Sequence, residues 1–382
     1  MTRLQQVLAI VSLLCMGCGG TAGEGTAPNE DTTQTDTSTP PVDPCDPANI
    51  TDPAITGLVY VDENQSSDTH YIQEMEAGVD TPLAGSDVRL VGADLDQTLA
   101  TCDDGSFAFS GLANGPYVVH VTATEDRGCT SANCAPQFAN AIASGEVTIL
   151  TVGDSVPVVS PGGAPLFPQR VADMIAPLAS VTNQNIAVGG TTTLDWLPGE
   201  GLFENTLSPK LADADVVVVS LGGNDLQFFV QDSMGSGDLL GAAATFPGFI
   251  DGVLANGLAI IEEIQKRAPH VDIVYCVYMN YLNTSQMKGL VGGFYDIAHS
   301  LLQNALDSVR TQFSAVDGVV LADMSSSLGE EPLDDYLMDF VHLSDQGHEF
   351  YAKEVFMALG GAIVGDEPLG LDRMVGLKPA AE

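Results

Sequence analysis

The chain has 382 residues, 45% of them hydrophobic, which is enough for two folded units with substantial cores and for flexible ends. Its 12 Lys and Arg residues face 51 Asp and Glu residues, a net charge of −39, and the basic residues are scattered along the sequence. Because a nucleic-acid partner needs a basic patch, we expect none, and strongly anionic substrates are disfavoured. The acidity instead favours solubility in a secreted protein.

The first residues have the pattern of a targeting segment. Arg3 provides a positive charge, residues 7–14 form an apolar run too short to span a bilayer, and a small residue precedes Cys18. This order resembles a bacterial lipoprotein signal, which implies that residues 1–18 are a signal peptide and that Cys18 is lipidated. Cys15 departs from the usual Leu, and the alternative is an ordinary signal peptide. We expect a lipid-anchored protein of the bacterial cell envelope, at the outer membrane, or an extracellular protein.

Residues 19–52 follow as a segment rich in Thr, Pro, Asp, Glu and Gly, without Lys or Arg. Such a composition cannot bury enough apolar surface to offset the entropy of ordering, so we expect a disordered tether. The tether would hold the folded units away from the membrane, and any membrane contact would be made through the lipid alone.

Residues 53–126 are predicted to form a small β-sandwich. Strand-like runs span residues 55–61, 86–91, 106–109 and 116–121. Asp-Gly and Asn-Gly pairs mark turns before the last two runs. The runs that begin near Gly57, Pro82, Gly105 and Gly115 resemble Cna-B or carboxypeptidase-regulatory-like domains. That resemblance implies an immunoglobulin-like sandwich used as a spacer or adhesive unit.

The cysteines and acidic loops do not indicate a metal site. Two pairs are candidates for disulfides in an oxidising compartment, Cys129 with Cys134 and Cys45 with Cys102, and Cys276 lies in an apolar run as a buried small hydrophobe. No cysteine or histidine pairs have the spacing of a zinc site. The acidic loop 62–68 lacks an ordered ligand spacing, so we expect it to be solvated rather than to bind calcium.

After a connector at 127–145, residues 146–363 alternate between strands and helices, and residues 364–382 form a tail. The predicted strands span residues 147–152, 185–188, 214–221, 271–278 and 319–323. The predicted helices span residues 166–178, 249–267, 294–313 and 347–359. This alternation predicts an α/β unit with a parallel sheet and helices on both faces, in which ligands bind at the carboxyl ends of the strands.

Four short blocks of this unit carry hydrolase chemistry. They are Gly-Asp-Ser at 153–155, the segment 185–192, Gly-Gly-Asn-Asp at 222–225, and Asp-Phe-Val-His at 339–342. A serine after a strand exposes its hydroxyl but needs an adjacent base. Asp339, three residues before His342, can orient that imidazole toward Ser155. His348 is a nearby second candidate, which we expect to be solvated and to which we assign no role in the reaction.

The remaining blocks supply hydrogen-bond donors for a developing oxyanion. Asn224 follows a buried strand and can donate its side-chain amide, while Asp225 is expected to orient the loop. In this order the four blocks resemble the GDSL family of SGNH hydrolases, esterases and lipases with a flavodoxin-like three-layer α/β/α fold and a Ser-His-Asp triad. The resemblance implies that Ser155, Asp339 and His342 are catalytic. It also implies an oxyanion hole of Ser155, Gly190 and Asn224, with Gly189 as the alternative to Gly190.

The expected function is hydrolysis of carboxylic esters of small molecules, lipids or acylated glycans through an acyl-enzyme, without a metal or other cofactor. The alternative is a non-catalytic surface-binding or adhesive protein with a degenerate hydrolase domain. Phe228 and Phe229 are candidates for an acyl pocket or for a core pair, and residues 230–246 for a lid or a plain loop.

Overall fold

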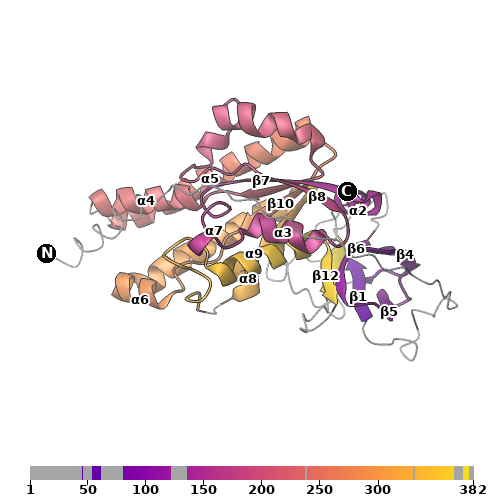
Figure 1. Ribbon diagram of the computed structural model, residues 1–382. Helices are drawn as coiled ribbons and strands as arrows, with labels where there is room; N and C mark the ends of the chain where they lie inside the picture. Colours follow the sequence, from indigo (N-terminus) through magenta and orange to yellow (C-terminus); the bar gives the residue numbers. More distant parts are fainter. Residues whose placement is uncertain are drawn as a thin grey trace.

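The computed structural model describes residues 45, 54–61, 81–121, 136–236, 239–329, 332–364 and 373–377. They form an α/β part and a smaller β part, which Figure 1 shows side by side. Cys18, the acidic loop 62–68, Cys129 with Cys134, and the tether apart from Cys45 lie outside the described residues.

The α/β part is built on a five-stranded parallel sheet with the strand order β11-β10-β9-β7-β8. In chain order the strands are β7 (Glu146–Gly153), β8 (Ser180–Asn185), β9 (Val216–Ser220), β10 (Asp272–Val277) and β11 (Val319–Asp323). The order is that of flavodoxin-like sheets, in which the strand order reverses between the first and third strands, here β7 and β9. Ligands bind beside the carboxyl ends of strands at such a reversal. The predicted α/β fold is confirmed.

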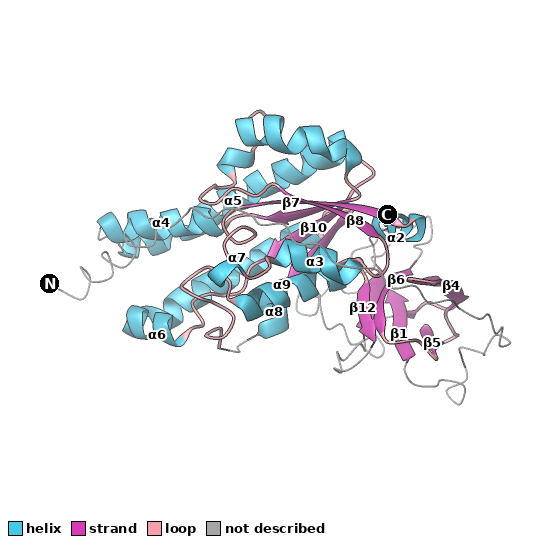
Figure 2. Cartoon of the chain, in the orientation of Figure 1, coloured by secondary structure: helices cyan, strands magenta, loops and turns pink. Residues whose placement is uncertain are grey.

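Helices cover both faces of this sheet, as Figure 2 shows. One layer contains α2 (Pro136–Ser144), α3 (Phe167–Ile175), α8 (Met324–Leu328) and α9 (Asp345–Ala358). The other contains α5 (Leu239–Arg267) and α7 (Tyr295–Ser314). Two further helices, α4 (Gly223–Ser236) and α6 (Ser285–Val291), follow the carboxyl ends of β9 and β10. Short helical turns lie at Pro161–Gly163, Leu194–Trp196, Phe203–Leu207, Ser208–Asp213 and Gly292–Phe294.

Helix α5 begins ten residues earlier than the sequence predicts, so most of the predicted lid or loop is helical. Its stretch Gly241–Arg267 has a mean hydropathy of 1.4 and is long enough to cross a membrane. However, Leu254, Ile260 and Ile264 on this helix are buried against the sheet. These residues place one side of the helix in a layer of the fold, and 28% of its most apolar window is buried.

The β part contains two small sheets around one core. The first contains β1 (Ala54–Val61), β2 (Thr81–Pro82), β5 (Ser106–Ser110) and β13 (Arg373–Leu377), and the second β3 (Asp87–Gly92), β4 (Leu95–Ala100), β6 (Gly115–Val121) and β12 (Gly361–Val364). Val59, Leu90, Phe107 and Val119 meet in the shared core. The expected disulfide between Cys45 and Cys102 is present and attaches the tether to this part.

The C-terminal segment corrects the predicted domain boundaries. Residues 364–382 were expected to form a tail, but β12 pairs antiparallel with β6 and β13 pairs parallel with β1. The run Gly-Ala-Ile-Val of β12 is too short to be assigned from its pattern. It forms a strand because β6 offers an open edge, and Ala362 becomes part of the β core.

The β part contacts the α/β part at the amino ends of the parallel strands. Helix α2, which lies in the predicted connector, places its Phe138 N–H 2.6 Å from a carboxylate oxygen of Asp272, the first residue of β10. Val91 and Val118 of the β part pack in the same apolar cluster as Phe138. Arg89 also donates to Asn140 of α2 at 3.4 Å. The β part is therefore attached at the sheet edge opposite the carboxyl ends.

His348 joins α9 to the start of α3 and to the segment after Ser155. Its Nδ1 accepts from the Phe167 N–H at 3.2 Å, and its Nε2–H donates to the Val159 carbonyl at 2.9 Å. The residue is fully buried, and this burial lowers the pKa of the imidazole because desolvation disfavours the charged form. His348 is thus a structural histidine that is held neutral.

Two truncations test the role of β12. Ending the chain after Gly360 removes β12 and β13, whereas ending it after Val364 removes β13 alone. We expect the shorter protein to be less stable by about 2–4 kcal/mol, because it loses the ladder to β6 and the buried Ala362. Scanning calorimetry should then show a Tm lower by about 5–15 °C than that of the longer truncation. Equal Tm values would contradict a structural role for β12.

Replacing His348 with Gln tests the buried neutral imidazole. Gln keeps one donor and one acceptor but does not titrate. Because the native pKa is lowered, the contribution of His348 to stability is complete above about pH 6.5 and is lost as the pH falls through the native pKa. On acidification the wild-type protein should lose up to about 1.4 kcal/mol per pH unit more than His348→Gln.

Urea unfolding between neutral pH and about pH 5 measures this difference. Asp272, whose pKa burial raises to about 7, titrates in the same window with the opposite sign. It is present in both proteins, so the comparison isolates His348. Parallel stability curves for the two proteins would show that the imidazole does not titrate as described.

Candidate active site

Ser155 lies where the chain leaves β7, directly beside the end of β9. The Asp154 N–H donates to the Ser220 carbonyl at 3.1 Å, which fixes the turn against the neighbouring strand. A Cβ atom on Gly153 would lie 2.7 Å from the same carbonyl oxygen. Only glycine permits this approach, so Gly153 allows the nucleophile turn to sit at the reversal point of the sheet.

The predicted triad residues form one hydrogen-bonded chain. The Oγ of Ser155 is 3.1 Å from Nε2 of His342, and Nδ1 of His342 is 2.7 Å from Oδ2 of Asp339. These distances suit an Oγ–H that donates to Nε2 and an Nδ1–H that donates to the carboxylate. All three residues are half-buried, so the serine hydroxyl is accessible to a ligand. The structure brings together the three residues that the spacing had indicated.

A tight hairpin holds the aspartate and the histidine. Leu337 and Leu343 pair as an antiparallel bridge, and the Met338 N–H donates to the His342 carbonyl at 2.9 Å. Burial alone would raise the pKa of Asp339, but donation from the His342 side chain and from the His342 and Val341 N–H groups outweighs it and lowers this pKa. Asp339 is therefore an ionised acceptor that is preorganised toward the imidazole.

The glycine loop favours Gly189 over Gly190 as the residue beside the nucleophile. A Cβ atom on Gly189 would lie 3.9 Å from Cα and Cβ of Ser155, whereas one on Gly190 would have no atom within 4 Å. Gly190 has a φ of 83°, a left-handed conformation that favours glycine. Within the described ranges, the N–H groups of Ser155 and Gly189 donate to no other protein atom. Both are therefore available to a ligand.

Asn224 is buried at the start of α4, and its side chain is held from the glycine loop. Its Nδ2 donates to the Thr191 carbonyl at 2.9 Å, which leaves the second amide hydrogen for a ligand. Thr191 is in turn fixed by the indole of Trp196, whose Nε1–H donates to the threonine Oγ1 at 3.0 Å. The only tryptophan of the chain thus supports the loop that orients Asn224.

Asp225 orients this loop as predicted. Its two carboxylate oxygens accept from the backbone N–H and the hydroxyl of Thr193, at 2.9 Å and 2.7 Å. Asn256 of α5 donates to the same hydroxyl at 3.0 Å. The carboxylate therefore joins α4, α5 and the segment after the glycine loop, without contact with the serine hydroxyl.

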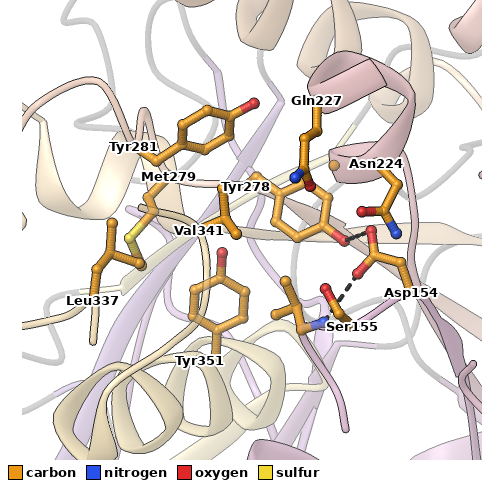
Figure 3. A pocket seen from close by; sticks show the side chains of 12 residues that line it. Asp154, Ser155, Asn224, Gln227, Tyr278, Met279, Tyr281, Leu337, Val341 and Tyr351 are labelled. Carbon is orange, nitrogen blue, oxygen red and sulfur yellow. Dashed lines mark hydrogen bonds between the residues drawn. The ribbon is translucent and has the colours of Figure 1, made fainter. Parts of the chain in front are cut away.

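A pocket opens beside Ser155 on the β10 side, as Figure 3 shows. Asn224 and Gln227 of α4 form one wall, and Tyr278, Tyr281 and Val341 lie on the others. Phe228 and Phe229 do not line it, because Phe228 is 44% exposed and Phe229 stacks on Phe249 with ring centroids 4.5 Å apart. The pair therefore neither lines this pocket nor forms a core pair, because only Phe229 is part of a packed aromatic cluster.

Sequence reasoning missed the residues that connect the blocks. Tyr278 and Trp196 carry no motif, and Thr191 was noted only as part of the block 185–192. The roles of these residues depend on which strand ends meet. Asp154 was noticed only as a neighbour of Ser155, although a buried carboxylate in this position signals a hydrogen-bond network. Within the described residues, no three His, Cys, Asp or Glu side chains gather as metal ligands would.

The chain is similar to several solved hydrolases. They include a lipase from a goat rumen metagenome (19% identity, 56% of this chain and 98% of that chain, TM-score 0.47) and an extracellular lipase from Streptomyces rimosus (16%, 56% and 99%, 0.40). A third is a catalytic mutant of an acetylxylan esterase from Geobacillus stearothermophilus (14%, 58% and 97%, 0.40). A search of curated proteins finds no match.

A comparison with family models gives a match over residues 150–350, more than half of the chain. This segment includes all four blocks and the strand ends that bring them together. The matching model describes the GDSL-like lipase/acylhydrolase family, and the chain belongs to that family.

Proposed function

We propose that the protein is a serine esterase in which Ser155, His342 and Asp339 are the catalytic triad. Membership of the family makes it a hydrolase of ester bonds. The observation that carries the assignment is the unbroken chain from the serine Oγ to the aspartate carboxylate, with distances of 3.1 Å and 2.7 Å. A degenerate hydrolase domain with only a binding role would not need this complete arrangement, so the geometry argues against that alternative.

The reaction follows from these positions. As the Oγ of Ser155 attacks the ester carbonyl carbon, Nε2 of His342 takes the hydroxyl proton. The Asp339 carboxylate stabilises the imidazolium that forms. His342 then protonates the leaving alcohol, and an acyl-enzyme remains on Ser155. A water molecule, activated by the same imidazole, attacks the acyl carbon and releases the acid.

The tetrahedral intermediates place negative charge on the former carbonyl oxygen. The donors that we assign to this oxyanion are the Ser155 N–H, the N–H of Gly190 or of its neighbour Gly189, and the free amide hydrogen of Asn224. The sequence resemblance gives this glycine as Gly190, with Gly189 as the alternative. An added Cβ would lie 3.9 Å from Ser155 at Gly189 and within 4 Å of no atom at Gly190, and neither N–H donates to another protein atom in the described residues. The Asn224 donor is preorganised by its bond to the Thr191 carbonyl.

The substrates that we propose are esters of small molecules, lipids or acylated glycans. We also propose that Cys18 anchors the protein to the bacterial cell envelope, and that the β part is a Cna-B-like spacer. The spacer role is supported by the attachment of the β part at the amino ends of the strands, opposite Ser155. The eight residues of β7 alone separate the two edges by roughly 25 Å at about 3.3 Å per residue.

The first test is hydrolysis of short- and long-chain p-nitrophenyl esters by the protein that begins at Gly19, beside its Ser155→Ala variant. We expect turnover in the parent protein and a loss of about 10⁴-fold or more in the variant, because the nucleophile is removed. Full activity in Ser155→Ala would refute the assignment of the nucleophile. The chain-length profile of the parent separates a lipase from an acetylesterase.

A histidine pair provides a matched comparison. His342→Gln should lose at least about 10³-fold in kcat, since no other group can take the serine proton. His348→Gln, measured at a pH above neutrality, should retain most of its kcat because the hydrogen bonds of His348 are made to backbone groups and not to Ser155 or Asp339. Steady-state kinetics of the two variants measure this contrast, and the reverse order would show that the base is misassigned.

A further inference from the structure

Asp154, next to the nucleophile, is the centre of a buried hydrogen-bond network. It is 1% exposed, and each carboxylate oxygen has its own donor. Oδ1 accepts from the Val156 N–H at 3.0 Å, and Oδ2 accepts from the Tyr278 hydroxyl at 3.0 Å. Figure 3 shows both bonds at the base of the pocket. The carboxylate therefore braces the turn that carries Ser155 from two sides.

Tyr278 extends this network to the strand that leads to Asn224. It follows directly after β10, and its hydroxyl lies 3.0 Å from the Oγ of Ser220, the last residue of β9. A Cβ atom on Gly223 would lie 3.1 Å from Oδ2 of Asp154 and 3.8 Å from the ring of Tyr278. One tyrosine hydroxyl thus connects the ends of β7, β9 and β10.

We propose that Tyr278 is a positioning residue that acts through Asp154, holding the Ser155 turn in register with the Asn224 loop. The inference rests on the proposed function, since it concerns the geometry of that same nucleophile and oxyanion hole. Tyr278 has no contact with the triad histidine in this role. It keeps the serine N–H and the Asn224 amide aimed at one point, where small displacements reduce the rate strongly.

Because the Asp154 carboxyl group can gain or lose a proton, the strength of this network should depend on pH. The pKa of Asp154 is raised to about 6, first by burial and also by the nearby carboxylate of Asp225 on α4. Donation from the Val156 N–H, the Tyr278 hydroxyl and the Gly223 N–H acts in the opposite direction. The other titratable groups that interact with Asp154 are buried and kept neutral by a raised pKa. These buried groups are Tyr275 and Cys276 of β10, Tyr278, Tyr281, and Tyr351 of α9.

The test is a double-mutant cycle of Tyr278→Phe and Asp154→Ala, measured on p-nitrophenyl acetate. Tyr278→Phe keeps the ring in the pocket and removes only the hydroxyl. We expect kcat to fall about tenfold or more, the equivalent of one hydrogen bond to a charged group, with KM changed less than about twofold. In the Asp154→Ala background the same substitution should change kcat by less than about twofold, because the carboxylate it positions is absent.

The pH profile gives a second readout that a packing role would not change. Donation from Tyr278 favours the ionised carboxylate, so its removal should raise the pKa of Asp154 and move the part of the acid limb that Asp154 sets to higher pH. This measurement needs only the Tyr278→Phe variant, so it tests the positioning role of Tyr278 even if Asp154→Ala does not fold. The control is Tyr117→Phe, which removes a tyrosine bond of 2.8 Å to the Ala113 carbonyl in the β part and should change neither kcat nor the profile.

The outcomes separate this inference from the proposed function. A parent protein that hydrolyses no ester overturns both. An active parent with an unchanged kcat and profile in Tyr278→Phe overturns only the positioning role. Additive losses in the cycle would likewise overturn it, because Tyr278 would then act independently of Asp154.

Discussion

The close approach of β7 and β9 at their carboxyl ends is the constraint on which the site depends. A Cβ atom added to Gly153 would lie only 2.7 Å from the Ser220 carbonyl oxygen, so the two strand ends can come this close only because Gly153 has no side chain. That contact brings the nucleophile turn and the start of α4 together at the point where the strand order reverses. The serine from one strand end and the amide of Asn224 from the next then face one pocket.

The sequence was sufficient for the residues whose chemistry is local. Asp339 and His342 share one hairpin, and Ser155 follows a buried strand, so each could be recognised within its own block. Their joint role was predicted from the order of the four blocks and the family that this order resembles. The choice between Gly189 and Gly190 was not local, because it depends on how the loop turns over Ser155. Tyr278 could not be found from a pattern, since its role exists only when three strand ends meet.

The fold, too, was predicted from features that are local in the sequence. Long apolar runs such as Val216–Ser220 and Val319–Asp323 are buried on both faces and identify the parallel sheet. The boundaries failed where a segment gains its structure from a distant partner. Gly361–Val364 is a strand only because β6 accepts it, and Asn185 ends β8 rather than beginning a strand, because the residues after it form the glycine loop.

The strand pairs made by β12 and β13 also have a consequence for biosynthesis. The strands of the β part lie on either side of the hydrolase unit in the sequence, with β1 to β6 before it and β12 and β13 after it. The ribosome therefore releases the whole hydrolase unit before the last strands emerge, so the enzyme can fold while its companion still lacks two strands. Completion of the β part therefore comes after synthesis of the hydrolase unit, and a chain cut short before β12 carries unpaired strand edges that favour association with other chains.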